Sequence, residues 1–258
     1  VGHLPVELRD ARVERLARLL RPVERRLLRR EQLAPPRSFY FLGIPSMSTQ
    51  TSSAAVVSFD SEPLIVVDAQ DHVLGHGTKA ELHRGSGTLH RAFSIFLFNA
   101  RGEVLLQQRS DQKALWPAFW SNTCCSHPRR GETYEIATQR RLEEELGVSA
   151  DLAFTHRFQY QAQYGVAGAE HELCSVYVGR IDRDPTPNPR EVADWRWISA
   201  SALDQWLSER PETLTPWFKL EWGALRSGRY AQALSSVGLD WSANSDATVS
   251  SDPSAVVG

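Results

Sequence analysis

Hydrophobic residues between positions 61 and 235 gather in short runs that polar and turn-forming residues separate. Runs of this length, rich in Val, Ile, Leu and aromatic residues, predict β-strands. One run is followed by Asn-Ala-Arg-Gly at residues 99–102, which indicates a tight hairpin turn into the next run. The predicted strands are residues 64–67, 92–98, 103–108, 154–164, 170–179 and 194–198.

A longer segment, residues 131–147, has a helical pattern. It is rich in Glu, Arg, Leu and Ala, places Arg140 four residues before Glu144, and ends at Gly147. Pairs of opposite charge at this spacing support a helix, and glycine commonly ends one. Two further helices are predicted near the end of the chain, at residues 200–208 and 216–226.

The order of these elements favours a mixed β-sheet sandwiched between helices, in the α/β (α+β) class. We expect a single folded domain over residues 61–235. Residues 1–60 are expected to form a partly disordered N-terminal extension, since a small, polar run begins at Met47. Residues 236–258 are again small and polar and are expected to be a disordered tail.

The Arg- and Leu-rich stretch that precedes Met47, the only methionine of the chain, has two interpretations. In one, Met47 is the natural start, and residues 1–46 are upstream sequence or an unusual extension. In the other, residues 6–31 form an amphipathic helix that packs on the domain. The sequence leaves both open.

Composition narrows the class of protein. The chain has 258 residues, 41% of them hydrophobic, which is enough for one sizeable core. Its formal net charge of −2 gives no general attraction to nucleic acid or anionic membranes, and no apolar run approaches the roughly 18 residues that span a bilayer. The first residues lack a secretory signal pattern, and three cysteines cannot all pair with one another. We therefore expect a cytoplasmic, monomeric protein without nucleic-acid or membrane partners.

The predicted central helix carries a recognisable pattern. Residues 132–148 resemble the Nudix box, in which carboxylates on one helix hold a divalent cation against a diphosphate. Two positions depart from the box: Ser126 replaces its first Gly, and Arg141 replaces a Glu. The change at Arg141 removes one metal-binding carboxylate and indicates a Nudix scaffold with altered chemistry. The retained positions are Glu132, Arg140, Leu142, Glu144, Glu145, Gly147 and Val148.

A second segment, residues 116–128, has the sequence WPAFWSNTCCSHP. It resembles the segment around the catalytic cysteine of type I isopentenyl diphosphate isomerases, which have the Nudix fold. The resemblance places the nucleophile-like cysteine at Cys125 and a metal-binding histidine at His127. Ser126 stands where the family often has Gly and is also small. Cys124 matches no role in the family, so we expect it to be structural.

The resemblance also extends to ligand positions outside these segments. His83 and His90 resemble a pair of family histidines with the same spacing. Glu170 and Glu172 alternate along a predicted strand, so both carboxylates project from one face and His171 from the other. Together with His127 they offer three imidazoles and two carboxylates, a set that suits Mn²⁺, Zn²⁺ or Fe²⁺ better than Ca²⁺.

Basic residues for a diphosphate follow from the same resemblance. Lys79, Arg109 and Lys113 align with family positions that contact the diphosphate, and their charges suit phosphate oxygens. The resemblance further implies that Glu145 binds a second ion, Mg²⁺, that bridges to the diphosphate. The other polar residues of the box are expected to hold the helix and its preceding loop together: Glu132, Arg140 and Glu144.

The resemblance implies a 1,3-proton shift that interconverts isopentenyl and dimethylallyl diphosphate in isoprenoid biosynthesis. Such a shift passes through a tertiary carbocation, so the site must exclude water and carry an acid and a base. We expect Glu172 to be the acid, with Tyr160 tuning its proton, and Cys125 to be the base. Trp217 would cover the cationic centre, and the aromatic residues 116–120 would help to exclude water.

Two alternatives remain. The first is a Nudix hydrolase of nucleoside diphosphate derivatives, which predicts a full acidic box and leaves the histidines and Cys125 without a role. The second is a non-catalytic binding protein of the same fold, which predicts that some of the Cys, Glu or His positions are lost. Neither pattern is present in this sequence.

Overall fold

Strand β3 (His90–Phe98) is the centre of the fold in the computed structural model, which describes residues 54–240. All of its residues except Arg91 are buried. β3 runs parallel to β8 (Gly168–Arg180) and antiparallel to β6 (Cys124–Ser126). The sheet is therefore mixed, as the sequence predicted.

The other strands extend this sheet in both directions. β7 (Leu152–Tyr164) forms a long antiparallel hairpin with β8. β1 (Pro63–Val67) joins the start of β3 and pairs with β2 (Val73–Thr78). At the other end of β3 follow β4 (Val104–Arg109), β5 (Trp120–Ser121) and β9 (Val192–Ile198).

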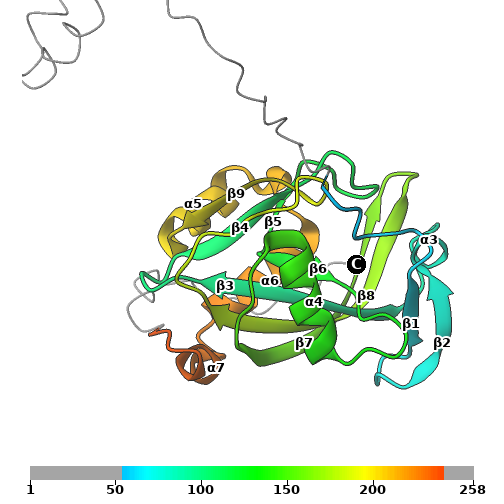
Figure 1. The fold of residues 1–258 in the computed structure, drawn as a ribbon, viewed down its shortest axis with the longest axis horizontal. Coiled ribbons are helices and arrows are strands. Elements are labelled where there is room, and N and C mark those ends of the chain that lie inside the picture. Colours follow the sequence, from blue (N-terminus) through cyan, green and yellow to red (C-terminus); the bar gives the residue numbers. More distant parts are fainter. Residues whose placement is uncertain (1–53, 241–258) are drawn as a thin grey trace, which may run out of the picture. The chain divides into compact units, whose positions relative to one another are not determined.

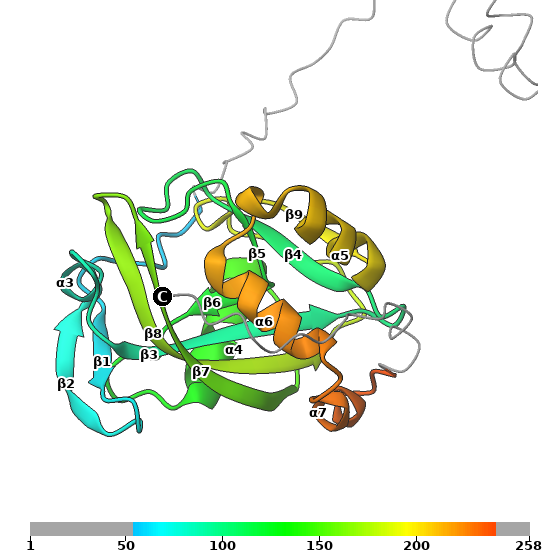
Figure 2. The same ribbon diagram turned by 180° about the vertical axis from the view of Figure 1, so that it is seen from behind.

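Helices cover both faces of the sheet. Helix α4 (Tyr134–Leu146) lies on one face, as Figure 1 shows, and α6 (Pro216–Arg226) lies on the opposite face, as Figure 2 shows. α4 ends at Gly147 in a left-handed conformation with φ 61°, as its sequence predicted. The remaining helices are α3 (Lys79–Leu82), α5 (Ala200–Glu209), the 3₁₀ turn Pro211–Thr213 and α7 (Ala231–Ser236).

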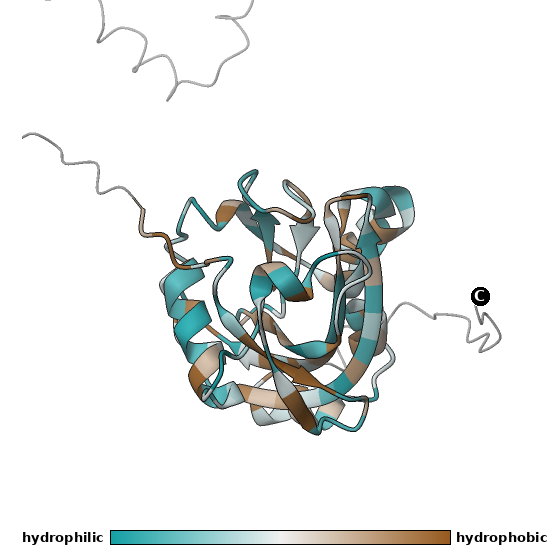
Figure 3. Ribbon diagram, turned by 90° about the vertical axis from the view of Figure 1, so that its right-hand side faces the viewer, coloured by the Kyte–Doolittle hydropathy of each residue, from teal (hydrophilic) through white to brown (hydrophobic). Residues whose placement is uncertain are grey.

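The alternation of side chains along β3 creates two cores. Phe93, Ile95 and Leu97 pack with buried residues of α4. Phe96 and Phe98 face the other way and pack with aromatic residues of α6. In Figure 3, hydrophobic colour is concentrated on the strands inside the molecule, and the outer ribbons are mostly hydrophilic. A strand buried on both faces explains why residues 92–98 are a nearly continuous apolar run.

The observed elements differ from the predicted ones mainly at their starts. β3, β7, β8 and β9 each begin two residues earlier than predicted, since polar residues such as His90 belong to them. The predicted hairpin turn is present, with Gly102 at φ 72° donating its N–H to Asn99. Elements that the sequence did not predict are α3, α7, β2, β5 and β6.

The described residues outside the predicted domain also contact it. The Val57 carbonyl accepts hydrogen bonds from Arg129 and Arg141, and Leu239 is 6% exposed. The bounds 61–235 stay a prediction, and the interpretations of Met47 and of residues 6–31 lie outside the described residues. Within residues 54–240, no helix has the length and apolar character needed to cross a membrane.

Candidate active site and metal centre

Five buried side chains meet near the start of β3. Each offers one ligand atom, and these atoms all lie within 4.8 Å of one another. They come from α3 and β3, from the residue after β6, and from β8, so the sheet topology assembles them. The five are the predicted ligands His83, His90, His127, Glu170 and Glu172.

Backbone carbonyl groups orient two of the histidine rings. His83 caps the end of α3, and its Nδ1 lies 2.6 Å from the carbonyl oxygen of Lys79. His90 Nδ1 lies 2.7 Å from the carbonyl oxygen of Thr88. A carbonyl only accepts, so both Nδ1 atoms carry a proton, and both Nε2 atoms are left to face the cluster. Helix α3 is short, but a capping box of Thr78 and Glu81 stabilises it.

The two carboxylates project from one face of β8 toward the imidazoles. Glu170 Oε2 lies 2.7 Å from His83 Nε2, and Glu172 Oε1 lies 2.9 Å from His127 Nε2. Register places Glu172 beside His90 of β3. His171 lies outside the cluster and contacts Gln159, as the alternation of the strand predicted.

The cluster has the properties of a divalent metal site. Among the described residues, the buried His90 Nε2 has no hydrogen-bond partner, and the buried His83 Nε2 and Glu170 Oε2 face only each other. Burial and the neighbouring His83 lower the pKa of His90 to about 4. Burial and His90 lower the pKa of His127 well below its usual range. Neutral imidazoles beside carboxylates are the form in which these residues bind a divalent ion.

Tyr160 connects the cluster to the rest of the site. It lies opposite Glu172 on β7, and its hydroxyl donates to Glu172 Oε2 at 2.6 Å. Burial and the Glu170 carboxylate raise the pKa of Glu172 well above its usual range, and the hydrogen bond from Tyr160 opposes this rise.

Cys125 lies on β6 and lines the same cavity as Glu172. Arg109 Nη1 lies 3.7 Å from its Sγ. Burial raises the pKa of the Cys125 thiol to about 12, although the Arg109 guanidinium opposes this rise. The thiol is thus protonated at neutral pH. Cys124 points into the opposite core and is fully buried.

The loop before β5 holds Arg109 in place. Arg109 Nε donates to the carbonyl of Trp116 at 3.0 Å, and Nη2 donates to the carbonyl of Leu115 at 2.8 Å. Trp116 and Ala118 have positive φ values of 48° and 62°, which are unfavourable for residues with a side chain. The loop therefore stores strain where it directs these two carbonyls at the guanidinium.

Aromatic rings form one wall of the site. Trp217, at the start of α6, is 2% exposed and lines the cavity. Its ring centroid lies 5.2 Å from that of Trp116 and 6.1 Å from that of Tyr160. Trp120, by contrast, packs on Trp206 away from the site. Within residues 116–120, Trp116 is the tryptophan that contacts the candidate catalytic residues.

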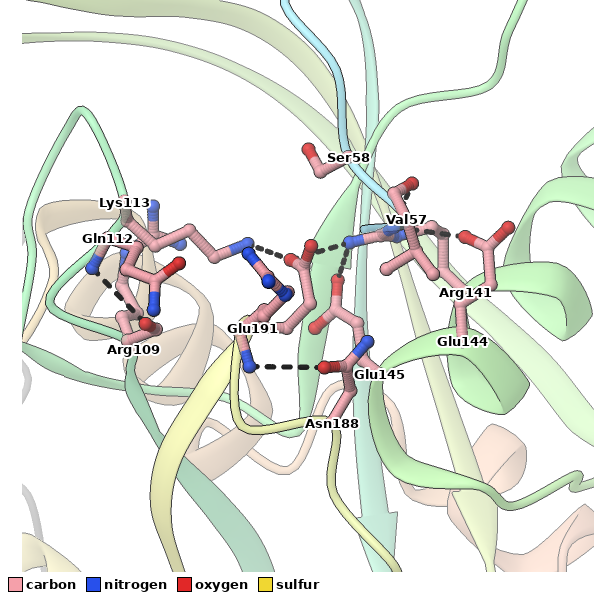
Figure 4. A network of polar contacts seen from close by, with 12 residues as sticks. Val57, Ser58, Arg109, Gln112, Lys113, Arg141, Glu144, Glu145, Asn188 and Glu191 are labelled. Carbon is pink, nitrogen blue, oxygen red and sulfur yellow. Dashed lines mark hydrogen bonds and ion pairs between the residues drawn. The ribbon is translucent and has the colours of Figure 1, made fainter. Parts of the chain in front are cut away.

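Basic residues surround the mouth of the cavity, whose volume is about 520 Å³. Lys79, Arg109 and Lys113, which the sequence predicts to contact a diphosphate, all line it. In Figure 4, Glu191 lies between Lys113 and Arg141 and forms ion pairs with both. Burial and the neighbouring charge of Lys113 lower the pKa of Lys79.

Glu145 lies beneath this mouth and is 1% exposed. One of its carboxylate oxygens forms an ion pair with Arg141, and the other accepts from Gln107 at 3.3 Å. Both oxygens therefore have protein partners. An ion at Glu145 requires that Arg141 release one of these oxygens.

Several polar residues of the cavity wall were not predicted to act in the site, among them Ser58, Arg141 and Glu191. The sequence analysis treated Arg141 only as a departure from the Nudix box. An arginine in place of a carboxylate on this helix was itself a signal of a further cation for the diphosphate. Glu191 comes just before β9, and no local pattern marks it. The remaining residues of the box hold the loop and helix together as predicted, because Arg140 forms ion pairs with Glu132 and Glu144.

The segment that contains most of this site matches a known domain family. Residues 88–218 match the NUDIX domain. The chain is 41% identical over 171 residues to "Isopentenyl-diphosphate Delta-isomerase 1" of Photorhabdus laumondii, which covers 66% of this chain and 97% of that relative. It is 44% identical over 157 residues to "Isopentenyl-diphosphate Delta-isomerase" of Serratia proteamaculans, which covers 61% of this chain and 87% of that relative.

The chain is thus a NUDIX-domain protein, and its mixed sheet between helices is the predicted fold. Within that class it belongs to the isopentenyl-diphosphate Delta-isomerase family, as the sequence resemblance predicted. Among solved structures, DR0079 from Deinococcus radiodurans is similar with a TM-score of 0.48 and 24% identity, over 58% of this chain and 90% of that one.

Proposed function

We propose that this enzyme interconverts isopentenyl diphosphate and dimethylallyl diphosphate by a 1,3-proton shift, a step of isoprenoid biosynthesis. One observation carries the proposal. The Cys125 thiol and the Glu172 carboxyl group of the metal-ligating cluster line the same cavity, together with basic residues. An acid, a base and a diphosphate-binding surface are what this reaction needs.

Glu172 is proposed to protonate the double bond. Its raised pKa and its hydrogen bond from Tyr160 support a carboxyl group that carries a proton to the substrate. Cys125 is proposed to remove a proton from the neighbouring carbon. It acts as the thiolate and becomes the thiol when it takes that proton. Burial raises its pKa to about 12, and Arg109 is the cation beside it that favours the thiolate.

Trp217 is proposed to face the carbocation. A ring face near a cation contributes about 0.5–2 kcal/mol, and more when water is absent. The low exposure of Trp217 and its contact with Trp116 support a site from which water is excluded. Exclusion of water matters because water would trap the cation as an alcohol.

The cluster of three histidines and two glutamates is proposed to hold Mn²⁺ or Zn²⁺. A bound ion would fix Glu172 and supply positive charge near its carboxylate. Mg²⁺ is proposed to bind at Glu145 together with the diphosphate, which would draw Arg141 away from that carboxylate. Oxygen ligands of this kind suit Mg²⁺.

Lys79, Arg109 and Lys113 are proposed to bind the diphosphate, and Arg141 joins them. The position of Arg141 also argues against the hydrolase alternative. Arg141 stands where the box has a carboxylate, and it neutralises Glu145 and Glu191 instead of adding a metal ligand.

The main test is an assay for interconversion of the two five-carbon diphosphates with Mg²⁺ and Mn²⁺ present. Release of phosphate from nucleotides without isomerisation would contradict the proposal.

The first prediction concerns Cys125. Replacement Cys125→Ala should lower turnover by at least about 10³-fold, because it removes the group that is proposed to exchange the proton beside Arg109. Binding of inorganic diphosphate, measured by calorimetry, should change less than about twofold. Cys124→Ala is the matched control, since it makes the same change in the opposite core and should keep turnover. Normal turnover of the Cys125 variant would show that the thiol is not catalytic.

A further inference from the structure

Residues 54–60 cross the mouth of the cavity, and we call this segment the strap. Val56, Ser58 and Asp60 of the strap line the cavity together with the basic residues. Figure 4 shows Val57 and Ser58 near Arg141 and Glu191. The strap therefore belongs to the wall of the proposed diphosphate site, although it is far from the other wall residues in sequence.

Backbone carbonyls of the strap accept hydrogen bonds from side chains of the domain. The Val57 carbonyl accepts from Arg129 and from Arg141, each at 3.1 Å. Of these donors, only Arg141 is a proposed diphosphate ligand. The bond from Arg129 therefore anchors the strap whether or not a diphosphate is present. Two further bonds of the same kind join Asn188 to the Ala55 carbonyl at 2.8 Å and Arg190 to the Ala54 carbonyl at 2.7 Å.

Ser58 makes a different contact. Its Oγ accepts from Nζ of Lys79 at 2.5 Å, because an ammonium group can only donate. The hydroxyl proton of Ser58 has no acceptor among the hydrogen bonds of the described residues. Ser58 thus presents a free donor beside a cation in a cavity wall.

Charge on this wall favours an anion. Lys79, Lys113 and Arg141 line the mouth, and the buried carboxylates beside them are Glu145 and Glu191. Glu145 and Glu191 share the guanidinium of Arg141, whereas the Lys79 ammonium forms no ion pair within residues 54–240 and donates to the neutral Ser58 hydroxyl. An anion that reaches Lys79 gains an unneutralised charge together with an adjacent hydroxyl donor.

We propose that Ser58 is a further diphosphate-binding residue, and that a bound diphosphate holds the strap closed over the cavity. The Lys79 ammonium and the Ser58 hydroxyl bind the same phosphoryl group, and Arg129, Asn188 and Arg190 keep the strap in place while they do so. The inference rests on the proposed function in taking a diphosphate as the ligand. It adds a contact from a segment that precedes the first strand.

Calorimetry of the full chain with inorganic diphosphate and Mg²⁺ tests the contact. Ser58→Ala should weaken binding about tenfold, the usual effect of losing one hydrogen bond to a charged group. Ser61→Ala is the matched control, because Ser61 is exposed, is not part of the cavity wall, and should leave the affinity unchanged. Equal affinities of the Ser58 variant and the wild-type protein would overturn the inference.

Chymotrypsin tests the closure. Phe59 is 50% exposed and lies next to Ser58, so the bond after it is open to cleavage. Diphosphate with Mg²⁺ should slow this cut several-fold in the wild-type protein and in the Ser61 variant, but not in the Ser58 variant. The cut site is identified by mass spectrometry. Cleavage that diphosphate leaves unchanged or accelerates in the wild-type protein would overturn the closure.

The two proposals can fail separately. If the wild-type protein binds diphosphate through Ser58 but does not isomerise the five-carbon diphosphates, the proposed function is wrong and the inference stands. If it isomerises them while the Ser58 variant binds diphosphate normally, the inference is wrong and the proposed function stands. Absence of any diphosphate binding by the wild-type protein would overturn both.

Discussion

At the scale of single residues, buried carboxylates in this enzyme differ in what surrounds them. Glu145 and Glu191 share an arginine, whereas Glu221 on α6 is fully buried, and no cation is among the partners that its shifted pKa reflects. One oxygen of Glu221 accepts from the Cys174 thiol, and the other has no partner among the described residues. Burial raises the pKa of Glu221 from 4.5 to about 7.

This difference has a consequence for stability against pH. The folded state holds the proton of Glu221 more tightly than the unfolded chain. The contribution of Glu221 to the free energy of unfolding therefore falls as the pH rises from 4.5 to about 7, and is constant above that. The total loss is roughly 3 kcal/mol.

Replacement Glu221→Gln should remove this loss, because glutamine has a similar shape and no charge. The variant should be more stable than the wild-type protein above pH 7, by up to about 3 kcal/mol, with the advantage shrinking toward pH 5. Urea unfolding at several pH values measures this. Glu143→Gln, an exposed site on α4, is the control and should follow the wild-type curve. A pH-independent effect at Glu221 would contradict the argument.

Single residues also mark how far the sequence could predict the site. All five members of the metal cluster were predicted, because their positions in the sequence resemble those of the isomerase family. Ser58 and Glu191 were not, since their positions depend on contacts with Lys79 and Lys113 that form only when the sheet is assembled. The sequence likewise contains no sign that burial raises the pKa of Cys125 to about 12.

At the scale of elements, the hairpin of β7 and β8 determines where the metal ligands lie. β8 starts at Gly168, whose φ is 148°, and the N–H of the next residue donates to the His83 carbonyl at 2.9 Å. A Cβ atom on Gly168 would lie 2.3 Å from that carbonyl oxygen. The close approach of β8 to the end of α3 therefore requires glycine here.

Gly168→Ala should push His83 away from Glu170. We expect metal affinity to fall about 10–100-fold, the usual effect of disturbing the support of a ligand, together with a loss of stability of about 1–3 kcal/mol. Metal titration and thermal unfolding measure the two effects. Gly165→Ala in the same hairpin is the control, because Gly165 also has a positive φ of 55° but a Cβ there meets nothing within 4 Å. It should lower stability by only about 1–2 kcal/mol and leave metal affinity unchanged.

Element predictions succeeded where one physical pattern dominated. β3, β4 and α4 were predicted because their signals are local in the sequence. Burial requires a run of apolar residues in β3 and β4, and Gly147 marks the end of α4. β2 was missed because none of its residues is buried and two of them are glycines. β5 and β6 have two and three residues, which is too short for any periodicity, and only pairing with β3 and β4 defines them.

At the scale of the whole molecule, the metal cluster joins segments that are far apart in sequence. Its ligands come from α3, β3, the loop after β6, and β8, and span residues 83 to 172. An ion bound there contacts the folded state alone and so stabilises it. The stabilisation is about 3 kcal/mol when free metal is at 100 times its dissociation constant.

Removal of the metal should therefore affect both stability and activity. Chelation should abolish turnover and lower the midpoint of thermal unfolding by about 5–10 °C. Mn²⁺ or Zn²⁺ should restore both, and Mg²⁺ alone should not. His83→Ala should eliminate the metal-dependent part of the melting temperature, whereas His171→Ala on the other face of β8 should retain it. Full recovery with Mg²⁺ alone would show that the imidazole cluster is not essential.

The parallel pairing of β3 with β8 has a kinetic consequence for this site. The pairing brings together residues that lie about 80 positions apart, such as His90 and Glu172, so it is among the costly loop closures of the fold. The complete ligand set exists only after that closure. A bound metal ion therefore mainly slows unfolding of the enzyme, and it hardly changes the rate of folding.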